Sequence, residues 1–150
     1  MKNAIVVAFA LVLLGLNACA DDGDGVLGVW HTTDNKSQVR IFKRNDHYFG
    51  QVMRLTRPNW PSDDKFGMGG KSKTDRNNPN PDLRARPIVG IQFMNDFVYV
   101  GNNLWEDGTI YDPEVGKTYK CKMTLAASNR LEVRGYIGIS LFGRTATWTR

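Results

Sequence analysis

The feature that most constrains the fold is a two-residue alternation of side-chain type that recurs along the chain. In the closing stretch GRTATWTR, Arg144, Ala146 and Trp148 alternate with threonines, and KTYKCKMTL alternates apolar and polar residues in the same way. A period of two places successive side chains on opposite faces of a β-strand. No stretch shows a convincing helical period, so the sequence predicts an all-β protein.

Strand-like runs with turn residues between them make up most of the chain. LGVWHTT, SQVRIFK and HYFGQVMRL come first, and PIVGIQFM, FVYVGNNLW, DGTIYD, KTYKCKMTL, RLEVRGYIG and GRTATWTR follow residue 87. Eight or nine short antiparallel strands fit either a β-sandwich or an up-and-down barrel. If the last strand paired with the first, the last strand would have no exposed edge. We therefore expect an up-and-down β-barrel of about eight strands.

The beginning of the chain has the composition of an export signal. Lys2 precedes an apolar run from Ile5 to Leu16, which at 12 residues is shorter than a membrane span of about 20. We expect residues 1–20 to be a signal peptide and residues 21–150 to form one domain. The mature protein would then lie in the periplasm or elsewhere in the cell envelope.

Two cleavage sites fit the end of this segment. Ala18-Cys19-Ala20 is a small-residue site, and cleavage after Ala20 would release a soluble chain. The letters LNAC also resemble a lipobox, in which Cys19 would be lipidated and would attach the protein to a membrane. Asn17 is uncommon inside a lipobox, so we favour cleavage after Ala20. Only Cys121 then remains with certainty, and no internal disulfide is expected.

Residues 56–87 interrupt the alternation with a long segment rich in Pro, Gly, Asn, Asp and Lys, which holds seven basic and four acidic residues. A loop of this length is either a functional lid or a disordered insert, and apolar residues such as Trp60 favour order. We expect a rigid cover over one barrel end. Arg84 and Arg86 could bind a carboxylate or phosphate of a ligand. The alternative is an ion pair of these arginines with nearby aspartates.

The letters GVW at residues 28–30 resemble the Gly-x-Trp motif of lipocalin and calycin barrels. In such barrels a basic side chain of the last strand packs across the tryptophan and plugs the closed end. Arg144 and Arg150 are the candidates for this role, because a guanidinium stacks favourably on an indole ring. The alternative is that Trp30 is a half-buried residue of an ordinary strand.

A broader resemblance covers almost the whole mature chain. GVWHT, TDRNNPNPDLRARPIVG, DGTIYDPEVGKTYKCKMTL and LEVRGYIG with GRTATWTR are together similar to the exported bacterial family of domain of unknown function 2147. The resemblance implies a lipocalin-like barrel and no settled biochemical activity. It also implies a cysteine within GYIGISLFGRT, where this chain has none. The family's recurrent residues fall on Trp30, Asp75, Asn78, Pro79, Arg86, Pro87, Gly90, Tyr111, Asp112, Pro113, Gly116, Tyr119, Gly135 and Trp148.

The stretch YDPEVGKTY has the composition of a turn between two strands. Asp112 and the following proline start a turn, and Gly116 supplies a positive φ. The functional alternative places Tyr111 or Asp112 at the mouth of the barrel.

The sequence gives little support to catalysis. His31 and His47 are the only histidines, and no spacing typical of a metal site surrounds them. We expect both to be exposed on strands, and Cys121 to be an inert buried thiol on an apolar face. No cofactor, metal or nucleic-acid partner is expected.

The leading hypothesis is a non-enzymatic envelope protein that binds a small amphiphilic or lipidic ligand in its barrel. The apolar body would lie in the barrel and an anionic head near the basic residues. The rival is a structural or protein-interaction module whose barrel is filled by its own side chains, with an unknown protein partner. The candidate ligand-binding residues are Trp30, Trp60, Arg84, Arg86, Tyr111, Asp112, Arg144 and Trp148.

Overall fold

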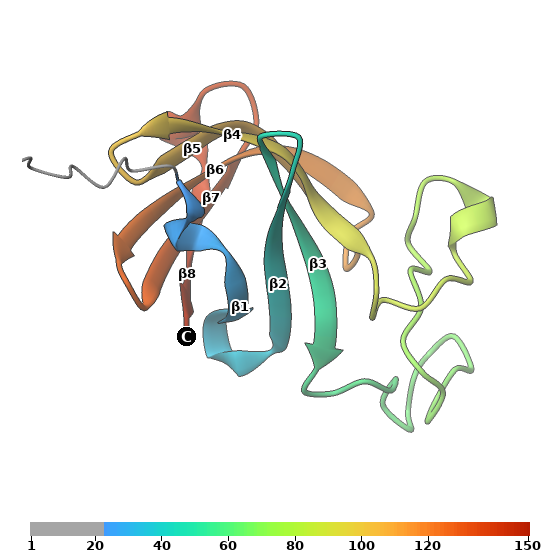
Figure 1. Cartoon of the computed structure of the whole chain (residues 1–150). Helices are drawn as coiled ribbons and strands as arrows, with labels where there is room; N and C mark the ends of the chain where they lie inside the picture. Colours follow the sequence, from blue (N-terminus) through green and yellow to red (C-terminus); the bar gives the residue numbers. More distant parts are fainter. Residues whose placement is uncertain (1–22) are drawn as a thin grey trace, which may run out of the picture.

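The computed structural model describes residues 23–150, so the expected signal peptide and Cys19 lie outside the described residues. Eight antiparallel strands follow one another around a closed barrel in chain order (Figure 1). This confirms the predicted all-β, up-and-down barrel. The strands are β1 (Gly28–His31), β2 (Ser37–Arg44), β3 (His47–Leu55), β4 (Gln92–Gly101), β5 (Leu104–Asp112), β6 (Lys117–Ala127), β7 (Arg130–Tyr136) and β8 (Arg144–Thr149).

The barrel closes through the first and last strands, as the sequence predicts. The pairing of β1 with β8 is short and joins His31 to Thr149. A hydrogen bond from the Thr33 hydroxyl to the Thr147 carbonyl, at 3.1 Å, adds to this seam. On its other side β8 pairs with β7 along its whole length, from Arg144 to Thr149.

Two predictions about individual strands need correction. The run PIVGIQFM is not one strand, because a turn closed by the Ile91 N–H and the Ile88 carbonyl precedes the start of β4 at Gln92. The run RLEVRGYIG is a strand only as far as Tyr136, where β7 ends, and the Ile137 side chain beyond it is exposed. Gly138, with φ of 74°, turns the chain away from the sheet there.

The two ends of the barrel differ, and we name them by what lies there. At the closed end lie the 3-10 helix η1 (Asp24–Val26) and Arg150, together with the tight turns after β2, β4 and β6. At the open end lie η2 (Thr33–Asn35), the long connection 56–91, the turn 113–116 and the β7–β8 connection 137–143, which contains η4 (Ser140–Phe142).

The core is concentrated at the closed end. Large side chains pack there against each other, with Tyr48 and Tyr99 both in ring contact with Trp105. A side chain at Gly108 would collide with the ring of Phe97, so glycine is required for this packing. The largest fully buried side chains are Trp30, Trp105, Tyr48, Phe97, Ile41, Met94, Met123 and Leu131.

The connection 56–91 stands beside the ends of β3 and β4 (Figure 1). It has two isolated bridges, Asn59 with Ser72 and Thr74 with Pro87, and one 3-10 turn, η3 (Pro81–Leu83). Part of it walls the open end. The segment therefore extends one side of the opening.

Candidate functional site

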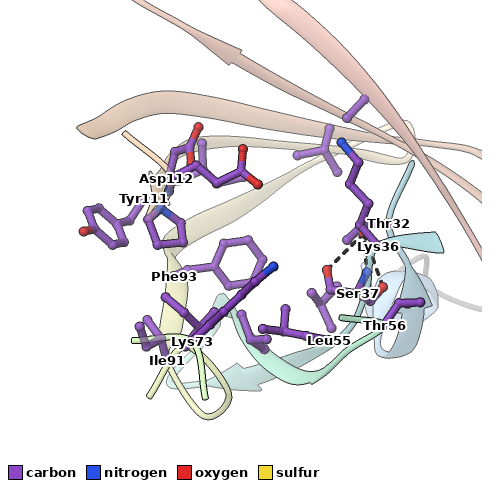
Figure 2. Close-up of a pocket in the computed structure, with 18 of the residues that line it drawn as sticks. Thr32, Lys36, Ser37, Leu55, Thr56, Lys73, Ile91, Phe93, Tyr111 and Asp112 are labelled. Atoms are coloured by element: carbon purple, nitrogen blue, oxygen red, sulfur yellow. Dashed lines mark hydrogen bonds between the residues drawn. The ribbon is translucent and has the colours of Figure 1, made fainter. Parts of the chain in front are cut away.

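A cavity of about 800 Å³ occupies the open half of the barrel (Figure 2). Its volume lies within the range of about 300–1,000 Å³ that is usual for small-molecule sites. Residues from the barrel strands and the open-end connections line it. Its apolar wall includes Val39, Val52, Leu55, Ile88, Ile91, Phe93, Ile110, Val133, Ala146 and Trp148.

Small inward side chains on β7 and at Ala146 of β8 leave space for the cavity. On these strands Leu131 is paired with Trp148, and the next inward pair is Val133 with Ala146. Gly135, the next inward position of β7, has no side chain and also lines the cavity. Phe93 lies 6.2 Å from Trp148, centroid to centroid, and the two rings form an aromatic part of the wall.

Four basic side chains surround the mouth of this cavity. Lys36, Arg57, Lys73 and Arg144 all line it. Among residues 23–150 none of the four forms an ion pair, since the salt bridges there involve other cations. Figure 2 shows the Lys36 and Lys73 chains at different sides of the space. Unpaired cations around an apolar cavity can bind an anionic group.

The mouth also holds three acidic residues, Asp34, Asp112 and Glu114. The Asp112 carboxylate accepts a hydrogen bond from the Glu114 N–H at 2.9 Å and so shapes the turn 113–116. These carboxylates could accept hydrogen bonds from donor groups of a ligand, while the cations bind its acceptor groups.

The closed end is sealed around Trp30. Its indole N–H donates to the Val26 carbonyl at 2.8 Å, which holds η1 across the barrel. The Arg150 guanidinium lies 4.3 Å from the centroid of the Trp30 ring and donates to the carbonyls of Gly25, Leu27 and Ser128. Of the two expected candidates, Arg150 therefore covers the tryptophan, while Arg144 lies at the opposite end of β8.

A polar cluster fixes η1 to the barrel wall. The Asp24 carboxylate accepts hydrogen bonds from Lys43 and Tyr48, each at 3.0 Å. The Lys43 hydrogen bond is the main cause that lowers the pKa of Asp24, and burial is the main cause that raises the pKa of Tyr48. The closed end is therefore also held by an ion pair and a hydrogen bond outside its aromatic core.

A buried carboxylate attaches the long connection to the barrel. Asp75 is 0% exposed and accepts hydrogen bonds from Arg86, Tyr111 and Asn78 at 2.6–3.0 Å. Burial and then the bond to Asp75 raise the pKa of the Tyr111 hydroxyl to about 12. These four residues are among those that the resemblance predicts to recur in the family. The structure gives them a common place, where the loop meets β5.

The turn 113–116 forms the second attachment of this loop. The Asn77 amide donates to the Glu114 carbonyl at 2.7 Å. A side chain at Gly116, whose φ is 68°, would collide with the Asn77 carbonyl. The predicted turn is therefore confirmed, and its glycine serves the loop contact as well as the turn.

The tip of the loop is built around Arg76. Its guanidinium lies 3.5 Å from the centroid of the Trp60 ring and donates to Asp64 at 2.7 Å. This hydrogen bond is the main cause that lowers the pKa of Asp64. Phe66 is exposed, and its ring centroid lies 4.6 Å from the Arg76 guanidinium.

The structure brings five of the eight candidate residues to the cavity and leaves three outside it. Trp30 lies at the closed end, Arg86 is paired with Asp75, and the Arg84 Nε donates to the Asn78 carbonyl at 2.8 Å. The Tyr111 ring lines the cavity but turns its hydroxyl away from it (Figure 2). The five at the cavity are Trp60, Tyr111, Asp112, Arg144 and Trp148.

Sequence reasoning missed Lys36, Lys73 and Phe93 as cavity residues. Phe93 is followed by Met94, which is also apolar and buried, so alternation alone could not tell which of the two points into the cavity. Lys36 follows the turn letters DN, and Lys73 lies in the irregular loop, where no period tells which way a side chain points.

The histidines and Cys121 form no catalytic cluster. His31 and His47 are half-buried strand residues, whereas the sequence suggested exposed ones. Cys121 is buried as expected, and burial raises the pKa of its thiol to about 12. Between residues 23 and 150 no group of three or more His, Cys, Asp or Glu side chains is placed to hold a metal ion. No helix within this part of the chain is long and apolar enough to span a bilayer.

A closed eight-stranded barrel with one plugged end and one open cavity defines a lipocalin-like protein. That fold typically serves binding rather than catalysis. The chain belongs to the bacterial family DUF2147, described as an uncharacterized protein conserved in bacteria, whose model matches residues 28–150.

A solved structure supports this class. Protein HP1028 from Helicobacter pylori, described as belonging to the lipocalin family, has a similar fold with a TM-score of 0.69 and 28% sequence identity. The match covers 83% of this chain and 81% of the other. No curated protein sequence matches this chain.

Proposed function

We propose that this protein binds a small amphiphile, with the apolar body of the ligand in the open-end cavity and an anionic head at its mouth. The observation that carries the proposal is the 800 Å³ apolar space with four unpaired cations around it. The apolar wall favours a hydrocarbon or ring system, because its transfer from water removes apolar surface from solvent. The cations favour a carboxylate, sulfonate or phosphate head.

The head would bind to Lys36 and Lys73 in particular. Lys73 comes from the long loop, and its ammonium lies 5.7 Å from the Trp60 ring centroid, so the indole holds this side chain near the opening. Lys36 comes from the β1–β2 connection, whose Thr32 and Ser37 hydroxyls are hydrogen-bonded at 3.0 Å. The two lysines therefore belong to separate segments of the mouth.

We further propose that the protein is exported and acts in the cell envelope. The basis is the Lys2-led apolar segment of the sequence. Mass spectrometry of the mature N-terminus would test both export and the choice between cleavage after Ala20 and lipidation of Cys19.

The rival function is a structural or interaction module. It predicts a barrel filled by its own side chains, whereas the structure fills the closed half alone. The loop 56–91 would then be the contact surface for a partner. A pull-down from envelope extract should in that case recover one protein with the intact loop and lose it when the loop is deleted.

The test of the binding proposal uses a probe of known chemistry. Dansyl-labelled undecanoic acid should bind with enhanced fluorescence, and its methyl ester should bind more weakly because it lacks the charge. Lys36→Gln with Lys73→Gln should weaken the acid by about tenfold, as expected for the loss of charge-assisted hydrogen bonds. The ester should be nearly unaffected.

A matched control removes two lysines elsewhere. Lys120→Gln with Lys122→Gln changes the charge equally on β6, away from the cavity lining. It should leave both probes bound as in the original protein. If both double variants lost the same affinity for the acid, the effect would come from the overall charge of the protein. If neither the acid nor the ester bound to the original protein, the proposal would be refuted. Mass spectrometry after incubation with envelope lipid extract would identify the natural ligand.

A further inference from the structure

Exposed apolar side chains are concentrated at the open end of the barrel. Within residues 23–150, eight of the 11 exposed large apolar side chains lie in open-end connections. Four of them belong to the β7–β8 connection: Ile137, Ile139, Leu141 and Phe142 are 74%, 60%, 74% and 78% exposed. Single exposed apolar residues are ordinary, whereas four in one short loop indicate an interaction surface.

The β7–β8 connection is built to keep these side chains outside. The Arg134 guanidinium donates to the carbonyls of Ser140 at 2.7 Å and Leu141 at 3.2 Å, and to the Thr145 hydroxyl at 2.8 Å. The backbone of the loop is thereby bonded to a side chain of β7. A side chain at Gly143 would come within 2.5 Å of the Gly135 carbonyl, so the loop also packs closely on β7. A fixed backbone that presents its apolar side chains outward is suited to contact with an apolar phase.

The loop stands directly beside the cavity. Its two flanking positions, Gly135 at the end of β7 and Arg144 at the start of β8, are paired with each other and both line the cavity. A ligand that leaves the mouth along this side would meet the apolar tip of the loop. The loop therefore borders the cavity at Gly135 and Arg144.

Charge favours a lipid surface as the occupant. The chain carries a formal net charge of +5, and at the mouth beside the loop the four basic residues outnumber the three acidic ones. Apolar side chains next to basic ones match a bilayer whose anionic head groups lie above its hydrocarbon.

We propose that the β7–β8 connection docks the open end on an anionic membrane, with Leu141 and Phe142 inserted among the lipids. Docking places the mouth of the cavity at the bilayer surface, where an amphiphile can pass between the two. This extends the proposed binding function, but docking itself can be measured without any ligand in the cavity.

The test is co-sedimentation of the protein, residues 21–150, with vesicles. Vesicles of phosphatidylglycerol and phosphatidylethanolamine should bind it about tenfold more tightly than phosphatidylcholine vesicles, and high salt should weaken the binding. Leu141→Ser with Phe142→Ser should reduce binding by about tenfold or more. The control, Val29→Ser with Val100→Ser, removes two partly exposed apolar side chains from β1 and β4 and should bind as the original protein does.

A site-specific probe identifies the inserted residue. Phe142→Trp should show a blue-shifted emission and quenching by brominated lipids on vesicle binding. Phe66→Trp, at a position 74% exposed in the long loop, should show neither. Equal shifts at both positions, or unchanged binding by the serine variant, would overturn the assignment to this loop.

The remaining outcomes separate the two proposals. If the original protein does not bind vesicles but forms a dimer, and the serine variant stays monomeric, the loop is a contact between two copies and the membrane proposal fails. If the serine variant loses vesicles but keeps dansyl-undecanoic acid, docking and cavity binding are separate properties. If the original protein binds vesicles but does not bind dansyl-undecanoic acid, the cavity function alone is refuted.

Discussion

The closed and open ends of this barrel are built from the same strands and yet have opposite interiors. At the closed end Trp30 and Trp105 fill the space between strands, and Arg150 covers the outside. At the open end the strands carry Val133, Gly135 and Ala146, and an 800 Å³ space remains. A barrel of this strand number can be filled or hollow, and here residue size along each strand decides which.

The difference also shows where each end obtains its rigidity. The closed end is held by its core and by side chains that bond to backbone carbonyls. The open end has a cavity between its buried wall residues, and polar attachments hold its walls from outside, above all Asp75 with Arg86 and Tyr111. This leaves the interior of the open end free for a ligand, since the buried polar cluster lies at the loop rather than in the cavity.

The largest expected effect comes from emptying the closed end. Trp30→Ala removes a fully buried indole and its hydrogen bond to Val26, and should lower the free energy of unfolding by about 3–5 kcal/mol. Urea unfolding followed by circular dichroism measures this.

The counterpart at the open end adds a side chain where space exists. Ala146→Leu should change the free energy of unfolding by less than about 1 kcal/mol, because it enters the cavity without overpacking. It should also weaken binding of dansyl-undecanoic acid. Similar destabilisation by the two changes would contradict the contrast between a filled and a hollow end.

The second effect concerns the loop attachment. Asp75→Ala leaves Arg86 and Tyr111 without their carboxylate and should cost about 2 kcal/mol, since partly buried polar groups lose their partner. Hydrogen exchange should rise sharply in residues 56–91 and stay unchanged in η1 and β1. Equal acceleration at both ends would mean that Asp75 supports the whole fold rather than the loop.

The sequence predicted the barrel well because its information on strands is periodic. Alternation in KTYKCKMTL gave the buried face that contains Cys121 and Met123, and closure followed from the need of the last strand for a second neighbour. The covering arginine was left as two candidates. Arg144 and Arg150 are six residues apart in the alternating run, so a period of two cannot tell which of them lies near Trp30.

The site was predicted less well because its decisive residues lie in irregular segments. Arg84 and Arg86 looked like ligand-binding cations, but their partners are Asn78 and Asp75, and only the folded loop shows these pairings. The cations at the cavity instead include Lys36 and Lys73. Whether any of these residues binds a ligand stays a prediction.

The third effect tests one close contact with a matched pair of glycines. Gly116→Ala should destabilise by about 1 kcal/mol more than Gly67→Ala, because the two glycines have φ of 68° and 71° but only Gly116 lies against Asn77. Thermal unfolding of both variants measures the difference, and the backbone penalty at positive φ cancels in it. No difference would show that Asn77 can move away freely, and the second loop attachment would then be weak.

The smallest effect is the pH dependence of stability, which compares a carboxylate at the closed end with one in the long loop. Asp24 at the closed end and Asp64 in the loop both have pKa values below the usual 3.8, because Lys43 and Arg76 stabilise the charged forms. A lowered folded pKa adds stability above pH 3.8, which is lost as the pH falls through the folded value. Asp24→Asn should therefore be less stable than the original protein at pH 7, with a gap that narrows below pH 3.8.

Asp64→Asn should show the same pH dependence, but in the local stability of the long loop. Because Asp64 bonds to Phe66, Met68 and Arg76 within one loop, its loss should speed hydrogen exchange there and leave global unfolding unchanged. Asp24 joins η1 to β2 and β3, so its loss should register in global unfolding. If the two variants lowered global stability alike, the loop would be part of the same cooperative unit as the closed end, and the distinction between a core-supported end and an externally attached one would fail.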